Sequence, residues 1–209
     1  MRRKVGIMGG TFDPIHVGHL ILGETALEQF GLDEVMFMPS GHPPHKPLRD
    51  GAPDEDRVNM VRLAVEGNDR FTVSLQEMHD EGYTYTRVTL ERLTAANPDT
   101  DYYFIMGGDS LMQFETWRDP QRICRLCTIA ASVRDGMTTQ ELETQIAHLK
   151  KIYDADIRVL GVPNLDISSS DIRHRCAGGR TFRYYVPESV YAYILQRGLY
   201  QAGPEDDAQ

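Results

Sequence analysis

Short hydrophobic runs alternate along this chain with longer segments in which hydrophobic residues recur at helical spacing. The short runs are largely apolar throughout, which is typical of strands that are covered on both faces. They predict strands over Val5–Met8, Val35–Pro39, Phe71–Ser74, Tyr102–Met106, Cys127–Ala131 and Ile157–Leu160. Strands that alternate with helices in this way indicate βαβ units and a parallel sheet.

The longer segments predict helices whose ends carry recognisable signals, such as Gly31 after the first of them. In the second segment, valines recur on one stripe, as expected for a helix that packs on a sheet. The helices are expected over Val17–Phe30, Asp54–Val65, Thr86–Ala96 and Thr138–Lys151.

The C-terminal part of the chain is expected to be helical. Ser168 to Asp171 form a capping-box pattern that opens one helix, and Pro187-Glu188 opens another. The second of these helices is expected to end at Gly198 and to turn inward the side chains of Val190, Ile194 and Leu195. We therefore expect an α/β fold, namely a Rossmann-like, doubly wound parallel sheet with a helical C-terminal subdomain. Residues 1–200 would form a single domain, and the polar residues 201–209 would form a disordered tail.

Composition narrows the class of protein. The formal net charge of −9 over 209 residues disfavours nucleic acid as a partner, because nucleic acids bind basic surfaces. No hydrophobic run approaches the ~20 residues of a membrane span, so a membrane partner is not expected either. Three cysteines are an odd count that argues against a disulfide framework, and the Cys124/Cys127 pair is expected in the core. We expect a cytoplasmic protein, and the sequence leaves open whether it forms a homo-oligomer.

The clearest candidate for chemistry is Gly9–His19, a glycine turn between the first predicted strand and the first predicted helix. The backbone N–H groups and the positive helix end at such a turn can hold a phosphate. Glycine allows close backbone approach to a ligand, and the backbone expected to do so is that of Gly9, Gly10, Thr11 and Phe12. His16 and His19 lie one helical turn apart and can face the same side. This combination favours chemistry on a nucleotide phosphate.

A zinc site is an alternative use of the same histidines. His16/His19 and His42/His45 form two His-x-x-His pairs, and four imidazoles can in principle bind zinc. No nearby cysteine or glutamate completes a familiar zinc spacing, and glycine loops suit phosphate better. We therefore expect no metal held by a dedicated set of protein ligands.

The glycine turn and its histidines resemble the HxGH signature of the nucleotidylyltransferase superfamily. Further motifs narrow the resemblance to bacterial nicotinate-nucleotide adenylyltransferases and extend it from about Val5 to Tyr200. These motifs are Pro43-Pro44-His45-Lys46, Thr84-Tyr85-Thr86, Gly107-x-Asp109, Trp117, Ser168-Ser169-x-x-Ile172-Arg173, Arg183–Pro187 and Gly198–Tyr200. Val88 stands where that family often has aspartate, so a role for this carboxylate is unsupported here.

The resemblance implies an enzyme of NAD biosynthesis that transfers AMP from ATP to nicotinate mononucleotide, giving deamido-NAD and pyrophosphate. His16 and His19 would be catalytic, because they would steady the α-phosphate. The phosphates of ATP would bind Gly9, Gly10, Thr11, Phe12, Lys46, Ser168, Ser169 and Arg173. Nicotinate mononucleotide would bind His45, Thr84, Tyr85, Thr86, Gly107, Asp109 and Trp117. Mg²⁺ would accompany ATP, held mostly by its phosphates and by water.

Related activities are the main alternatives. They are an adenylyltransferase for nicotinamide mononucleotide or phosphopantetheine, a cytidylyltransferase, and a non-catalytic nucleotide-binding module. Trp117 and Arg183–Pro187 argue against the phosphopantetheine and cytidylyl enzymes. The histidine pair, Lys46 and Arg173 argue against a non-catalytic module. The sequence carries only indirect information on the preference for acid over amide, because a few pocket contacts decide it.

Overall fold

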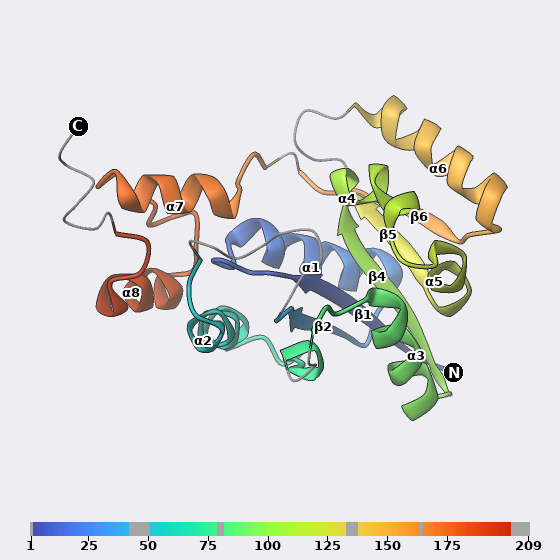
Figure 1. The fold of residues 1–209 in the computed structure, drawn as a ribbon, viewed down its shortest axis with the longest axis horizontal. Helices are drawn as coiled ribbons and strands as arrows, with labels where there is room; N and C mark the ends of the chain where they lie inside the picture. The colour runs from blue at the N-terminus through green and yellow to red at the C-terminus, as the bar shows by residue number, and fades with distance from the viewer. Residues whose placement is uncertain (1, 42–50, 79–81, 133–137, 164, 202–209) are drawn as a thin grey trace.

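Six parallel strands form one sheet in the order β3-β2-β1-β4-β5-β6 in the computed structural model of the chain (Figure 1). The structure describes residues 2–41, 51–78, 82–132, 138–163 and 165–201. The strands are β1 (Arg3–Gly10), β2 (Glu34–Pro39), β3 (Phe71–Val73), β4 (Thr100–Gly107), β5 (Thr128–Ser132) and β6 (Ile157–Leu160). The order reverses between β1 and β4, so the doubly wound prediction is confirmed. Ligands bind such sheets outside the carboxyl ends of the strands at this reversal.

Helices join the strands, and most of them lie where the sequence pattern predicts. They are α1 (Val17–Phe30), α2 (Asp54–Val65), α3 (Thr86–Ala96), α4 (Gly108–Met112), α5 (Pro120–Leu126), α6 (Thr139–Tyr153), α7 (Ser169–Ala177) and α8 (Glu188–Arg197), with short 3₁₀ turns at Gln76–Met78 and Phe114–Thr116. The bounds of α1, α2 and α3 match the prediction at both ends, and each strand matches to within two residues. The sequence analysis did not predict α4 and α5, because one or two turns are too short to show a helical period.

Side chains that alternate along each strand build a hydrophobic core on both faces of the sheet. On β1, Val5 and Ile7 join one core cluster and Met8 joins the other. The first cluster contains side chains of α3, α5 and α6, and the second contains those of α1, α2, α7 and α8. Cys124 and Cys127 are buried in the first cluster, as predicted. Burial raises the pKa of the Cys124 thiol to about 11, so this thiol stays protonated and unreactive.

The last helix, α8, packs against α2 through polar as well as apolar contacts. Figure 1 shows α7 and α8 gathered beside α1 and α2 and away from α6. Ser189 Oγ donates to the carbonyl oxygen of Leu63 at 3.0 Å, and Tyr193 donates to Asp56 at 2.8 Å. Arg197 and hydrogen bonding from Tyr193 lower the pKa of Asp56 against the opposing effect of burial. These contacts hold α8 against α2, in agreement with the predicted packing of the C-terminal helices.

Two details of the C-terminal helices differ from the prediction. Leu195 is 46% exposed, whereas Val190 and Ile194 are fully buried. Positions four residues apart share a helix face, and Leu195 lies about 100° further round than Ile194. At the start of α7, Ser168 accepts a hydrogen bond from the N–H of Asp171, which is half of the expected capping box. The carboxylate of Asp171 accepts from Arg175 at 2.8 Å instead of returning to Ser168.

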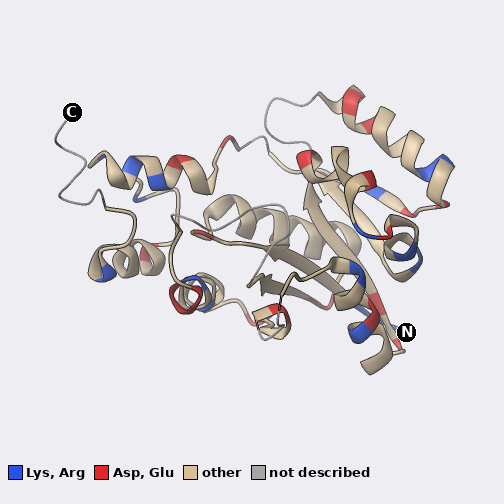
Figure 2. Cartoon of the chain, viewed as in Figure 1, with Lys and Arg blue, Asp and Glu red and all other residues tan. Residues whose placement is uncertain are grey.

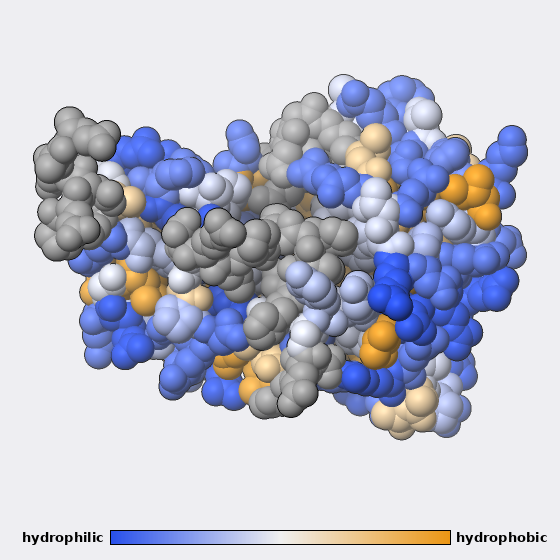
Figure 3. All heavy atoms as spheres, in the orientation of Figure 1, coloured by the Kyte–Doolittle hydropathy of each residue, from blue (hydrophilic) through white to orange (hydrophobic). Residues whose placement is uncertain are grey.

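Polar residues cover most of the face of the molecule drawn in Figure 3. On the face drawn in Figure 3, the described residues are mostly hydrophilic, with small and separate hydrophobic patches. No helix within the described ranges has the length and hydrophobicity that crossing a membrane requires. The predicted tail covers residues 201–209, and all of it except Gln201 lies outside the described residues.

Candidate active site

The signature segment leaves the carboxyl end of β1 and enters α1, at the reversal of strand order. Gly9 and Gly10 still pair with Met38 and Pro39 of β2, and His16 is the N-cap residue of α1. Phe12 adopts a positive φ of 49° and is 3% exposed, so its ring is folded back into the core. A Cβ on Gly10 would lie 3.2 Å from that ring. Gly10 therefore leaves room for the Phe12 ring. The close approach of this backbone to a ligand stays a prediction.

The two histidines of the signature form a stacked pair. Their ring centroids are 3.7 Å apart with an interplanar angle of 30°. His16 is 1% exposed, whereas His19 is partly exposed. The N–H of His16 donates to Nδ1 of His19 at 3.2 Å. Because Nδ1 of His19 accepts this hydrogen bond, a proton on a neutral His19 ring resides on Nε2.

Gly18 makes room for this stack. A Cβ at Gly18 would lie 3.0 Å from Nδ1 and 3.1 Å from Cε1 of His16. The His16 ring is buried and stacked on His19, so it has little freedom to move aside. The sequence analysis identified both histidines, and the structure shows why a glycine separates them.

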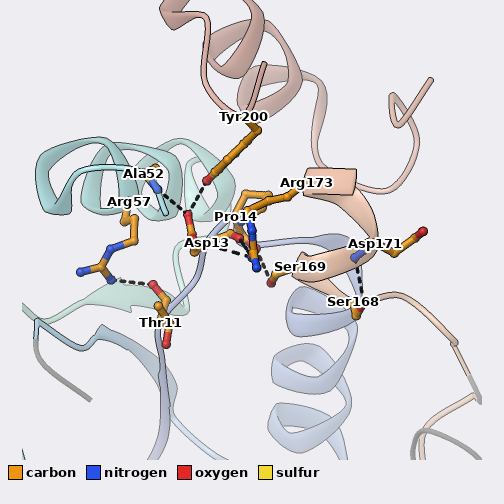
Figure 4. A network of polar contacts seen from close by, with 10 residues as sticks. All are labelled: Thr11, Asp13, Pro14, Ala52, Arg57, Ser168, Ser169, Asp171, Arg173 and Tyr200. Carbon is orange, nitrogen blue, oxygen red and sulfur yellow. Dashed lines mark hydrogen bonds and ion pairs between the residues drawn. The ribbon is translucent and has the colours of Figure 1, made fainter. Parts of the chain in front are cut away.

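The start of α7 meets the signature loop through Ser169 and Arg173, both of which the sequence analysis assigned to the phosphate site. Arg173 donates from Nη1 to the carbonyl oxygen of Asp13 at 2.6 Å and lies 3.6 Å from Oδ2 of that residue (Figure 4). Ser169 Oγ donates to the carbonyl oxygen of Pro14 at 2.9 Å. Along α7, one acidic residue near the start of the helix is followed by two basic ones (Figure 2). Arg173 thus lies beside the signature loop, with its side chain 34% exposed.

Asp13, Arg57 and Tyr200 belong to the same network, and the sequence analysis assigned none of them to the site. Arg57 of α2 is fully buried and donates from Nη1 to the carbonyl oxygen of Thr11 at 2.6 Å. Tyr200 donates to Oδ1 of Asp13 at 2.6 Å (Figure 4). Asp13 and Tyr200 lie within the segments Gly9–His19 and Gly198–Tyr200 that carry the family resemblance. The signal for Arg57 was its place as a charged residue next to the valine stripe of α2. Such a residue is expected on the surface unless it has a partner.

The residues predicted to bind a mononucleotide gather around the end of β4. Gly107 is the N-cap residue of α4, Asp109 lies exposed in the first turn, and Thr84 is buried just before α3. Tyr85 is the N-cap residue of α3, so neither Thr84 nor Thr86 caps that helix, as a purely structural role would have required. The guanidinium carbon of Arg118 lies 4.8 Å from the centroid of the Tyr85 ring.

Trp117 connects this group to the rest of the site. Its ring contacts Phe104 of β4 edge-on, with a centroid distance of 5.9 Å, and Phe114 at 5.5 Å. A Cβ on Gly9 would in turn lie 3.7 Å from the Phe104 ring. Trp117 is only partly buried. The two predicted groups of site residues therefore lie at the same edge of the sheet, on adjacent strands.

The predicted residues His45 and Lys46, together with His42 of the alternative zinc site, lie outside the described residues. Elsewhere in the chain, the described residues contain no group of three or more His, Cys, Asp or Glu side chains arranged to hold a metal ion. The carboxylate of Asp13, within the signature segment, accepts hydrogen bonds from the N–H of Ala52 and the hydroxyl of Tyr200.

Comparisons with known proteins agree with this geometry. The model of the cytidylyltransferase-like family matches residues 7–175. A probable nicotinate-nucleotide adenylyltransferase of Lachnoclostridium phytofermentans is 45% identical over 198 residues, which cover 95% of this chain and 99% of that protein. A second one, from Thermoanaerobacter sp., is 40% identical over 97% of each chain. The solved structure of Plasmodium falciparum nicotinic acid mononucleotide adenylyltransferase complexed with NaAD shares the fold, with a TM-score of 0.78, 17% identity and coverage of 97% of this chain and 100% of that one.

Proposed function

This chain belongs to the cytidylyltransferase-like family and to the nicotinate-nucleotide adenylyltransferases within it, and from this premise we propose how its residues act. The enzyme transfers the adenylyl group of ATP to nicotinate mononucleotide, producing deamido-NAD and pyrophosphate in NAD biosynthesis. The observation that carries the proposed roles is the stacked His16–His19 pair at the N-terminus of α1, directly after a glycine turn.

The reaction needs no covalent intermediate with the protein. A 5′-phosphate oxygen of nicotinate mononucleotide attacks the α-phosphorus of ATP, and the bond to the bridging oxygen of pyrophosphate breaks. Catalysis then depends on positioning and on stabilising the negative charge that develops on the α-phosphate. His19 donates from Nε2 to an α-phosphate oxygen, and the buried ring of His16 holds the His19 ring in place while it contributes to the same site. The N-terminus of α1 adds its positive end.

The remaining triphosphate is proposed to bind between the signature loop and α7. Arg173 presents part of its guanidinium to solvent, so it can form planar hydrogen bonds to phosphate oxygens. Ser168 and Ser169 place the first N–H groups of α7 beside it. Backbone amides from Gly9 to Phe12 and the side chain of Lys46 complete the proposed phosphate contacts.

A divalent metal generally accompanies ATP in enzymes of this kind, and we propose that the ion is Mg²⁺. The donor set fits an ion that arrives bound to ATP. Asp13 already accepts hydrogen bonds from two protein donors, and the described residues hold no other acidic cluster at the signature loop. The phosphates of ATP and water would therefore supply most of its ligands.

Nicotinate mononucleotide is proposed to bind at the end of β4, between Thr84–Thr86 and Trp117. The partly exposed indole of Trp117 offers a flat face to the pyridinium ring, and the backbone and hydroxyl groups of Thr84–Thr86 can receive its carboxylate. Gly107, Asp109 and His45 complete this proposed set. The cytoplasmic location and the absence of a nucleic-acid partner remain predictions.

Replacing Trp117 by alanine is expected to raise the KM for nicotinate mononucleotide by roughly tenfold, because a stacking partner for a cationic ring is lost. The KM for ATP should change by less than about twofold, since the proposed ATP site lies on β1 and α7. Steady-state kinetics with each substrate varied in turn measures both values. Trp117→Phe, which keeps an aromatic face, serves as the matched control and should lose less. Equal increases in both KM values would contradict the stacking role.

The overall activity is tested by supplying ATP and Mg²⁺ with nicotinate mononucleotide and, separately, with nicotinamide mononucleotide. Pyrophosphate release should have the higher kcat/KM with the acid. A preference for the amide would assign the enzyme to the related activity instead. Two outcomes would overturn the assignment. One is pyrophosphate release from ATP with phosphopantetheine but with neither mononucleotide, and the other is pyrophosphate release when CTP, but not ATP, is supplied.

A further inference from the structure

Asp13 is a buried carboxylate on which distant parts of the chain converge. Its side chain is 5% exposed. Oδ1 accepts a hydrogen bond from the N–H of Ala52 at 3.0 Å, just before α2, and another from the hydroxyl of Tyr200 at 2.6 Å, beyond α8 (Figure 4). A buried carboxylate is strongly destabilised unless such donors satisfy it. Two neutral donors therefore satisfy one oxygen of a buried carboxylate that belongs to the signature loop itself.

The backbone and the surroundings of Tyr200 keep its hydroxyl as a hydrogen-bond donor to Asp13. Tyr200 follows the C-cap residue Gly198 closely and adopts a positive φ of 61°, which turns the chain back toward Asp13. Burial, followed by the negative charge of Asp13, raises the pKa of the Tyr200 phenol far above its usual range. The phenol therefore stays protonated at every pH at which the enzyme works.

The guanidinium of Arg173 lies beside the same carboxylate. Its Nη1 lies 2.6 Å from the backbone carbonyl oxygen of Asp13 but 3.6 Å from Oδ2 of the carboxylate. The longer separation exceeds hydrogen-bond distance, so the carboxylate does not hold the guanidinium in a tight ion pair. The same guanidinium is the proposed ligand of the ATP phosphates. A guanidinium held closely by one carboxylate binds a second anion less strongly.

We propose that Tyr200 is a positioning residue for ATP, because its hydroxyl satisfies the Asp13 carboxylate and so leaves the Arg173 guanidinium available to the triphosphate. This inference rests on the proposed function, in which Arg173 binds ATP phosphates. Without the phenol, the buried carboxylate of Asp13 has only the Ala52 N–H on Oδ1 and draws the guanidinium of Arg173 toward itself. Binding of ATP must then break that closer ion pair.

The test compares Tyr200→Phe with Tyr193→Phe, because each removes one phenol that donates to a buried aspartate. Tyr193 donates to Asp56 at 2.8 Å, and Asp56 is 1% exposed, but this pair joins α8 to α2 away from the signature loop. Calorimetric titration with Mg²⁺-ATP should show a Kd roughly tenfold higher for Tyr200→Phe than for the unaltered enzyme, as expected for one charge-assisted hydrogen bond. The Kd of Tyr193→Phe should stay within about twofold, although both variants should melt at lower temperature.

Asp13→Asn completes a double-mutant cycle. The amide keeps an acceptor for Tyr200 and Ala52 but removes the charge that competes for Arg173. Tyr200→Phe should therefore change the Kd for ATP by less than about twofold in the Asp13→Asn background. If Tyr200→Phe does not fold, Asp13→Asn decides alone. Its Kd for ATP should be no higher than about twice that of the unaltered enzyme, and a tenfold increase would contradict the proposal.

Three results would overturn the inference. They are a Kd for ATP that Tyr200→Phe leaves unchanged, an equal effect of Tyr193→Phe, and an effect of Tyr200→Phe that persists in the Asp13→Asn background. The binding measurement does not depend on turnover. Failure of the unaltered enzyme to release pyrophosphate from ATP and nicotinate mononucleotide would refute the proposed function, whereas the pattern of Kd values would still judge the role of Tyr200.

Discussion

Replacing His19 by alanine is expected to lower kcat by roughly 10²-fold or more, as found when one preorganised donor to a developing negative charge is removed. The hydrogen bond from the His16 N–H to Nδ1 leaves Nε2 as the proton-bearing atom of a neutral His19. This nitrogen is therefore proposed to meet the α-phosphate in the transition state. The KM values should change less than kcat, because an interaction made mainly in the transition state contributes little to substrate binding. Pyrophosphate release under saturating substrate measures the effect.

His148→Ala is the matched control for this substitution. His148 is exposed on α6, and its Nε2 lies 3.2 Å from a carboxylate oxygen of Glu115. Its loss should leave kcat within about twofold, since exposed side chains away from special features rarely matter. Circular dichroism confirms that both variants are folded. A folded His19→Ala enzyme with full turnover would refute the catalytic assignment of His19.

Replacing Arg57 by alanine is expected to lower the free energy of unfolding by about 3 kcal/mol. Its side chain is fully buried, so truncation leaves a cavity between α2 and the signature loop. The carbonyl oxygen of Thr11 and the carboxylate of Asp54 each lose a hydrogen bond of 2.6 Å. For a chain of this length, such a loss corresponds to a fall in Tm of roughly 10 °C. Chemical and thermal denaturation measure both quantities.

Arg62→Ala is the matched control, because Arg62 lies on the same helix and is exposed. Its removal should change the free energy of unfolding by no more than about 0.5 kcal/mol. Arg57→Ala should also lower kcat beyond its effect on stability, since Thr11 belongs to the loop that presents amides to ATP. Equal and small effects of the two substitutions would show that the buried guanidinium does not support the loop.

The histidine pair of the signature shows how much a local sequence pattern can predict. His16, Gly18 and His19 lie within one turn of a helix whose start is marked by the glycine turn before it. Their spacing on that helix follows from its period alone, so the sequence predicted that both histidines share a face. The 3.7 Å stacking and the burial of His16 could not be predicted, because they depend on Phe12 and on the packing of α1.

The positions of Trp117 and Leu195 could not be predicted from a local sequence pattern. The place of Trp117 in the site came from family resemblance, and the structure adds its contacts with Phe104 and Phe114. The prediction that Leu195 faces inward was wrong, because one helix offers a narrow buried stripe and Val190 and Ile194 already fill it. Hydrophobic character by itself does not specify which side of a helix meets the core.

By itself the sequence determined the succession of the six strands and the longer helices along the chain, the parallel sheet and the signature turn. The reason is that hydrophobic period and turn chemistry act over a few neighbouring residues. The tertiary structure alone decided which partners support that turn. Asp13 meets Ala52 and Tyr200, which are 39 and 187 positions away. A buried charge requires compensating donors, but no local pattern states which distant residues supply them, since only the packing of α2, α7 and α8 around the loop brings those donors within reach.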